Sequence, residues 1–228
     1  MDIINCIDII EKEKYIQRVL KWYDKNKRTF PWRKVTDPYK IMVAEILLQK
    51  TNANKVILVY DVLISKFPNI TQLLNANVED IKEIIRPLGL IKKANFLKKC
   101  SLMITTEYGG IIPDNKEKLL NLPGIGNYTS NAILCFSYNK YVPLMDVNIA
   151  RILRRLFNLP SKKRVESDTN ITKLAEKIIQ KNQPFNIKNY HYGLIDLSAS
   201  ICKHKNPICP ECPFNNFCIF CAQGRTYF

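Results

Sequence analysis

The sequence predicts an all-α protein, and two observations carry this prediction. Apolar residues recur at spacings of three and four along the chain, as on the buried face of a helix. No region combines sustained apolar and polar alternation with the turn pairs of a β-hairpin. The chain has 228 residues, is 46% hydrophobic and contains only 7 Gly and 12 Pro, so it can bury a real core. We expect one compact body with two lobes.

The first helix of interest is expected over residues 41–48, which are apolar except for Glu45. An ionised carboxylate without a partner would be costly to bury in such a helix. Desolvation would raise the pKa of Glu45 toward the range in which it can donate a proton or a hydrogen bond. The alternative is that Glu45 lies on an exposed edge of the helix.

Residues 119–134 predict two helices joined by a tight turn. Gly124 and Gly126 flank Ile125 in this turn, and glycine lets a backbone approach a phosphate closely. The N-terminus of the second helix adds N–H groups and the positive end of its dipole. We therefore expect a phosphate-binding hairpin, with an ordinary helix connection as the alternative.

A further helix is expected to begin directly after Asp146, whose side chain suits an N-cap. Its apolar residues fall on one stripe and its arginines on the other, so we expect the arginines to face phosphates. Residues 86–99 and 140–164 are both strongly basic, in a chain with a net charge of +15. Such runs predict contact with nucleic acid, although a solvated face is the alternative.

The C-terminal loop holds four cysteines in the pattern Cys-x6-Cys-x2-Cys-x5-Cys: Cys202, Cys209, Cys212 and Cys218. Prolines between them favour tight turns, which allow the four sulfurs to converge. Zinc sites usually consist of two close pairs, whereas four thiolates from one short loop favour an iron–sulfur cluster. Zinc stays the alternative metal. We interpret Cys221 as a spare thiol, and the other three cysteines as core residues: Cys6, Cys100 and Cys135.

The sequence also indicates a compartment. No apolar stretch approaches the roughly 18 residues needed to cross a bilayer. Asp2 stands where a signal peptide would need a basic residue. We expect a cytoplasmic, monomeric protein, associated with the nucleoid if it is prokaryotic, whose cysteines stay reduced.

These motifs together resemble the helix-hairpin-helix DNA glycosylases of the endonuclease III superfamily. The resemblance is carried by residues 122–126 and 44–49, by Asp146 and by the four-cysteine loop, which span almost the whole length. It implies a two-lobed, all-α fold with a six-helix lobe over residues 28–136. It also implies an iron–sulfur cluster lobe, built from residues 1–27 and 137–228, that holds a [4Fe–4S] cluster. The implied partner is double-stranded DNA containing a mismatched or damaged base.

The resemblance implies roles for individual residues. Asp146 would stabilise a cationic sugar or orient the attacking water, and Asn148 would bind the DNA backbone or that carboxylate. Glu45 would recognise a flipped base, and residues 124–126 would hold a phosphate. Three further residues would fill the gap left by the base or merely contact phosphate: Gln49, Lys50 and Leu90.

Tyr128 stands where bifunctional relatives carry a lysine that forms a Schiff base, and a phenol cannot form that adduct. Mismatch-specific thymine glycosylases have a tyrosine there, whereas adenine glycosylases usually have a small hydroxyl residue. A structural aromatic is the alternative. The chain ends ten residues after Cys218, so we expect it to lack the C-terminal recognition domain of typical adenine glycosylases.

The sequence thus predicts a monofunctional glycosylase, with weak or no AP lyase activity, that removes thymine and uracil opposite guanine. Two enzyme alternatives stay open: an adenine glycosylase without its C-terminal domain, and an enzyme acting on oxidised pyrimidines. A non-catalytic DNA-binding module of the same fold is a third alternative. Asp146 and Glu45 argue against that module, because a pure binder gains nothing from carboxylates facing phosphates.

Overall fold

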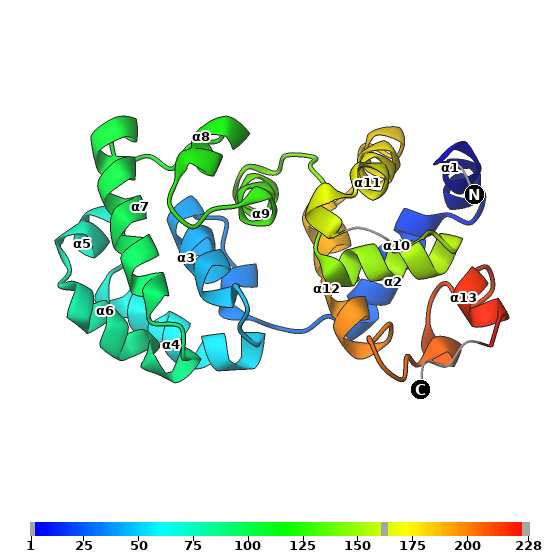
Figure 1. Cartoon of the computed structure of the whole chain (residues 1–228), viewed down its shortest axis with the longest axis horizontal. Coiled ribbons are helices and arrows are strands. Elements are labelled where there is room, and N and C mark those ends of the chain that lie inside the picture. The colour runs from blue at the N-terminus through cyan, green and yellow to red at the C-terminus, as the bar shows by residue number, and fades with distance from the viewer. Residues whose placement is uncertain (1–2, 161–163, 225–228) are drawn as a thin grey trace. The chain divides into compact units, whose positions relative to one another are not determined.

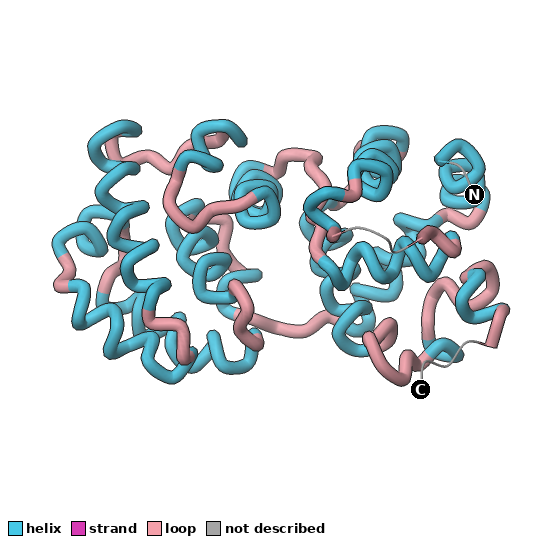
Figure 2. Tube along the Cα trace, viewed as in Figure 1, coloured by secondary structure: helices cyan, strands magenta, loops and turns pink. Residues whose placement is uncertain are grey.

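A computed structural model of the chain describes residues 3–160 and 164–224, and this part contains helices and loops but no strand (Figures 1 and 2). The all-α prediction is confirmed. No described helix is both long and apolar enough to cross a membrane. The α-helices of the described part are α1 (Ile3–Lys12), α2 (Tyr15–Asn26), α3 (Pro38–Leu48), α4 (Ala53–Lys66), α5 (Ile70–Asn75), α6 (Val78–Ile85), α7 (Lys92–Tyr108), α8 (Lys116–Asn121), α9 (Asn127–Tyr138), α10 (Val147–Phe157), α11 (Thr169–Lys181), α12 (Ile187–Ser200) and α13 (Ile219–Ala222). Short 3-10 turns lie at η1 (Pro31–Arg33), η2 (Arg86–Leu88), η3 (Val165–Ser167) and η4 (Cys209–Glu211).

Short polar side chains set the starts of many helices. At α3, Asp37 accepts hydrogen bonds from the backbone N–H groups of Tyr39 (2.8 Å) and Lys40 (3.1 Å). Pro38 follows at the first helical position, where its missing N–H costs nothing. Asparagine side chains cap α4, α5, α6 and α8 in the same manner: Asn52, Asn69, Asn77 and Asn115.

The chain divides into two compact units, and the first comprises residues 29–140 with helices α3 to α9. Helix α3 lies at its centre and packs against α4, α7 and α9. Every residue from 41 to 47 is buried, so α3 is enclosed on all sides. This enclosure explains why its sequence is apolar almost throughout rather than along one stripe.

The second unit is formed by Met1–Arg28 and Tyr141–Phe228, as far as these ranges are described. Helix α2 packs against α12, and α1 packs against α11, so the two ends of the chain share one core. Gly193 allows the close approach of α2 and α12, since a Cβ there would lie 2.7 Å from Val19 Cγ1. An ion pair between Arg28 Nε and Asp196 Oδ1 (2.6 Å) joins the segment that follows α2 to α12.

The expectation that the arginines of α10 face phosphates is wrong. Arg155 is only 9% exposed, and Arg154 forms an ion pair of 2.7 Å with Asp168, with both side chains at most 15% exposed. Arg151 donates to Cys202 O, which follows α12, and to Ser198 O within α12. The arginines on the polar stripe of α10 thus bind groups within their own unit.

The basic run over residues 86–99 is only partly a surface run. Lys93 is 2% exposed, and Lys98 donates to backbone carbonyls at the end of α5, including Ala76 O at 2.7 Å. Three other basic residues of the run are exposed: Arg86, Lys92 and Lys99. Only these three are available for contact with a phosphate backbone.

Candidate active site and cysteine-lined pocket

Glu45 is a buried acid in the central helix α3. Its side chain is 7% exposed, so the alternative of an exposed helix edge is wrong. Burial raises the pKa of Glu45 to about 7, and the nearby Arg33 guanidinium partly opposes this rise. Near neutral pH the carboxyl is therefore present in both protonation states. It can donate a proton or a hydrogen bond, or accept one.

The turn between α8 and α9 needs glycine at position 124 for two reasons. Gly124 has a φ of +80°, and a Cβ there would lie 2.7 Å from Cγ of Phe96. Gly126 differs, because its φ is −100° and no heavy atom lies within 4 Å of its ideal Cβ. Ile125 is buried, so only its backbone can contact a ligand. The hairpin thus packs closely against Phe96 of α7.

Gln49, expected as a wedge into DNA, is bound to this hairpin. Its Nε2 donates to Gly124 O (2.8 Å) and to Thr129 Oγ1 (3.2 Å), which ties the end of α3 to the start of α9. Lys50 is exposed and adopts a left-handed φ of 54°. Tyr128 is half-buried in the first turn of α9.

Lys93 is a functional candidate that the sequence did not reveal. Its Nζ donates to Leu47 O and to Thr51 Oγ1, both at 2.6 Å. These bonds fix both ends of the loop that carries Gln49 and Lys50. Its position within a basic run gave no signal of burial, since the acceptors lie more than 40 positions earlier in the chain.

Leu90 lies between η2 and α7, directly after Gly89, whose φ is +72°. Leu90 is half-buried, whereas its neighbour Ile91 is 45% exposed. The tip of this loop thus presents two adjacent aliphatic side chains.

Asp146 caps α10, as its position predicts. Its Oδ1 accepts hydrogen bonds from the backbone N–H groups of Asn148 (2.9 Å) and Ile149 (2.8 Å). Its Oδ2 accepts a third bond from Nδ2 of Asn148 (2.9 Å). The carboxylate is therefore fixed in orientation by the first turn of the helix. It belongs to the unit formed by both chain ends, whereas Glu45 and Tyr128 belong to the other unit.

A chain of hydrogen bonds runs from Asp146 to the cysteine loop. Oδ1 of Asn148 accepts from Nη1 of Arg151 (2.8 Å), which fixes the amide that binds Asp146. Arg151 also donates from Nε to Cys202 O (2.9 Å) and from Nη2 to Ser198 O (3.1 Å). The sequence did not reveal this role of Arg151, although its spacing of three from Asn148 places both on one helix face.

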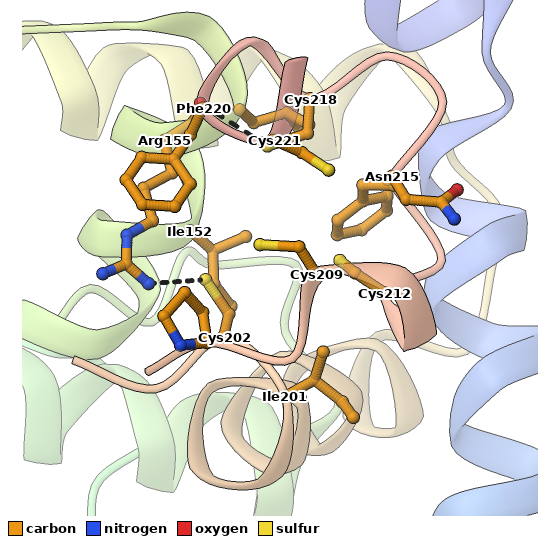
Figure 3. Close-up of a pocket in the computed structure, with 13 residues that line it drawn as sticks. Ile152, Arg155, Ile201, Cys202, Cys209, Cys212, Asn215, Cys218, Phe220 and Cys221 are labelled. Atoms are coloured by element: carbon orange, nitrogen blue, oxygen red, sulfur yellow. Dashed lines mark hydrogen bonds between the residues drawn. The ribbon is translucent and has the colours of Figure 1, made fainter. Parts of the chain in front are cut away.

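The cysteine loop and α10 enclose a pocket lined by the four expected thiols and by Cys221 (Figure 3). Apolar side chains of α10, α13 and the loop complete its walls, among them Ile152, Phe214 and Phe220. Burial, together with the nearby thiols, raises the pKa of Cys209 to about 11 and that of Cys212 to about 12. A bound cation would be needed to keep these sulfurs as thiolates.

Arg155 brings a positive charge to the wall of this pocket. Its Nη1 lies 3.4 Å from Cys202 Sγ and 2.6 Å from Lys203 O, and its Nη2 donates to His204 O (2.9 Å). The guanidinium carbon lies 4.5 Å from the centroid of the Phe220 ring. These contacts hold the start of the cysteine loop against α10.

The model of the HhH-GPD superfamily of base excision DNA repair proteins matches residues 43–181, which include Glu45, the glycine hairpin and Asp146. The chain belongs to this superfamily. It is 39% identical over 210 residues to the thymine-DNA glycosylase of Aeropyrum pernix, covering 90% of this chain and 92% of that protein. It is 34% identical over 223 residues to the thymine/uracil-DNA glycosylase of Pyrobaculum aerophilum, covering 94% and 96%.

A solved structure described as a thermostable thymine-DNA glycosylase superposes on this HhH-GPD protein with a TM-score of 0.87. The two are 29% identical, and the match covers 94% of this chain and 99% of the other. The protein is therefore a DNA glycosylase of base excision repair, with DNA as its partner. The predictions of family, fold and enzyme class are confirmed, in place of a non-catalytic binding module.

Proposed function

We propose that this glycosylase removes thymine and uracil mispaired with guanine from double-stranded DNA, acting as a monofunctional enzyme on its own as a monomer. The observation that carries the proposal is its similarity to thymine and thymine/uracil glycosylases over 92% and 96% of their lengths. The adenine alternative has less support than these near full-length matches. Tyr128 supports a lack of AP lyase activity, because a phenol cannot form the Schiff base that such activity requires.

Asp146 is the proposed catalytic carboxylate. Loss of the base leaves positive charge on the sugar, and a carboxylate already fixed in place stabilises that charge without reorganising. Its three hydrogen bonds from the first turn of α10 supply this fixed orientation. Asn148, whose amide is held by Arg151, is proposed to position the carboxylate.

Glu45 and Tyr128 are proposed to bind the flipped base. A thymine or uracil ring presents carbonyl acceptors and an N–H donor, so a group that can both donate and accept suits it. A carboxyl whose pKa is about 7 is such a group at neutral pH. The phenol of Tyr128 adds an aromatic face and a hydroxyl.

The glycine hairpin is proposed to bind a phosphate through backbone N–H groups of residues 124–126 and the start of α9. The N-cap of α9 is Gly126, and no side chain caps the helix there. The first turn of α9 also contains no acidic residue, so nothing in it neutralises the positive end of the helix dipole. Lys50 is proposed to contact the DNA near the extruded base, and Leu90 to intercalate. Gln49 is proposed to exchange its bond to the hairpin for a contact with DNA.

The cysteine-lined pocket is proposed to hold a [4Fe–4S] cluster with four ligands: Cys202, Cys209, Cys212 and Cys218. Its donors are soft thiols, with no carboxylate or imidazole among the lining residues. Within the described ranges, no three His, Cys, Asp or Glu side chains converge closely enough for one metal ion. Four cysteine thiolates from one short loop are a usual ligand set of an iron–sulfur cluster, whereas zinc sites usually consist of two close pairs, so the spacing favours a cluster. When bound, the cluster would crosslink the loop and brace it against α10.

The substrate proposal is tested with end-labelled duplexes that carry T·G, U·G, A·G or T·A at one position. Base release is scored as strand cleavage with and without alkali. We expect cleavage at T·G and U·G only, and only after alkali treatment. Cleavage confined to A·G would overturn the proposal in favour of the adenine alternative.

The role of Asp146 is tested with Asp146→Asn, which we expect to abolish base release while DNA binding persists. Asp168→Asn is a matched control, because Asp168 caps α11 in the same manner. The control is expected to keep base release even if its stability falls. Retained turnover in Asp146→Asn would refute the assignment.

A further inference from the structure

Cys221 is a fifth thiol in the cysteine-lined pocket, together with the four proposed ligands (Figure 3). It lies in α13, the single helical turn that begins directly after Cys218. Cys218 is the N-cap of this turn and Cys221 is its third residue, so the two cysteines lie within one helical turn of each other. The place of Cys221 is therefore set by the helical backbone of α13.

Cys221 and Cys209 line the same pocket, although Cys209 lies in η4 and Cys221 lies in α13. The loop thus brings a fifth thiol, from a separate helical turn, to the four proposed ligands.

Core packing does not explain this cysteine. The three cysteines that serve the core are fully buried at 0% exposure: Cys6, Cys100 and Cys135. Cys221 is half-buried and faces a pocket walled by other thiols. The helix that carries it is only four residues long, so a small shift of one turn can move its sulfur.

We infer that Cys221 is a reserve ligand of the cluster, which binds iron in place of Cys218 when Cys218 is lost or displaced. This inference rests on the proposed cluster. In the exchange, the bond from iron to Cys218 Sγ breaks and a bond to Cys221 Sγ forms. The proton released by the Cys221 thiol is taken up by the Cys218 thiolate, so charge and oxidation state do not change.

The test compares full-length Cys218→Ala, Cys221→Ala, the double variant and Cys212→Ala, all purified without oxygen and reconstituted with iron and sulfide. Iron and acid-labile sulfide per chain are measured together with visible absorption. We expect Cys221→Ala and Cys218→Ala to keep the iron content of the wild type. The double variant and Cys212→Ala are expected to lose most of it. Loss in Cys218→Ala equal to that in the double variant overturns the inference.

A second measurement does not depend on the folding of Cys218→Ala. Iron release to a chelator is followed in the wild type and in Cys221→Ala, and we expect release to be several-fold faster in the variant. Equal rates would overturn the inference. A wild-type protein that binds no iron would instead refute the proposed cluster, so the two failures are distinguishable.

Discussion

Replacing Glu45 by Gln is expected to stabilise the protein at pH 8 and to leave its stability near pH 4.5 almost unchanged. Burial raises the pKa of Glu45 from 4.5 to about 7. Between these values the folded protein holds a proton that the unfolded chain has released, so stability falls as pH rises through this window. At about 1.4 kcal/mol per pH unit, the loss amounts to about 3 kcal/mol. Glutamine cannot ionise and escapes this loss.

The assay is denaturant unfolding of the wild type and Glu45→Gln at several pH values from 4.5 to 8. The difference between the two proteins isolates Glu45, because every other titrating group is shared. Glu83→Gln is the matched control for the loss of a carboxylate, since Glu83 is an exposed acid in the same unit. A stability difference for Glu45→Gln that does not change with pH would refute the reasoning from burial.

Three further substitutions, one of them with a matched control, test the site. Gly124→Ala is expected to lower the free energy of unfolding by roughly 2 kcal/mol because of its φ and its contact with Phe96; Gly126→Ala, which meets no such obstacle, should cost much less in the same denaturation assay. Arg151→Met removes three hydrogen bonds from a charged donor and is expected to cost about 3 kcal/mol. Single-turnover base release should also slow in this variant, whereas an unchanged rate would show that the hydrogen-bond chain does not position Asp146. Tyr128→Lys is expected to gain strand-nicking activity, detected as a borohydride-trapped adduct with DNA; absence of the adduct would contradict the proposed place of Tyr128.

The features predicted well from sequence are those that depend on local patterns. Helical periodicity gave the all-α class, and an acid in an otherwise apolar helix gave the burial of Glu45, because a helix apolar on every face has to lie inside. The spacing of four cysteines within one loop brought them to one pocket. In each case the residues involved are close in sequence, so local backbone geometry alone determines how they are placed.

The features predicted wrongly depend on contacts distant in sequence. The polar stripe of α10 could face solvent or another element, and the periodicity is the same in both cases. The element that covers it begins about 50 positions later, where Cys202 O and Lys203 O accept from Arg151 and Arg155. The hydrogen bond from Gln49 to Gly124 O, which the sequence did not reveal, also spans 75 positions.

These long-range contacts give the cysteine loop a mechanical connection to the proposed catalytic carboxylate. Arg151 and Arg155 together bind the backbone carbonyls of residues 202, 203 and 204, and Arg151 also holds the amide that binds Asp146. If the loop loses its order, these arginines lose their acceptors, and the first turn of α10 loses a support for Asn148. By ordering this loop, the proposed cluster would therefore support the orientation of Asp146 without taking part in the chemistry.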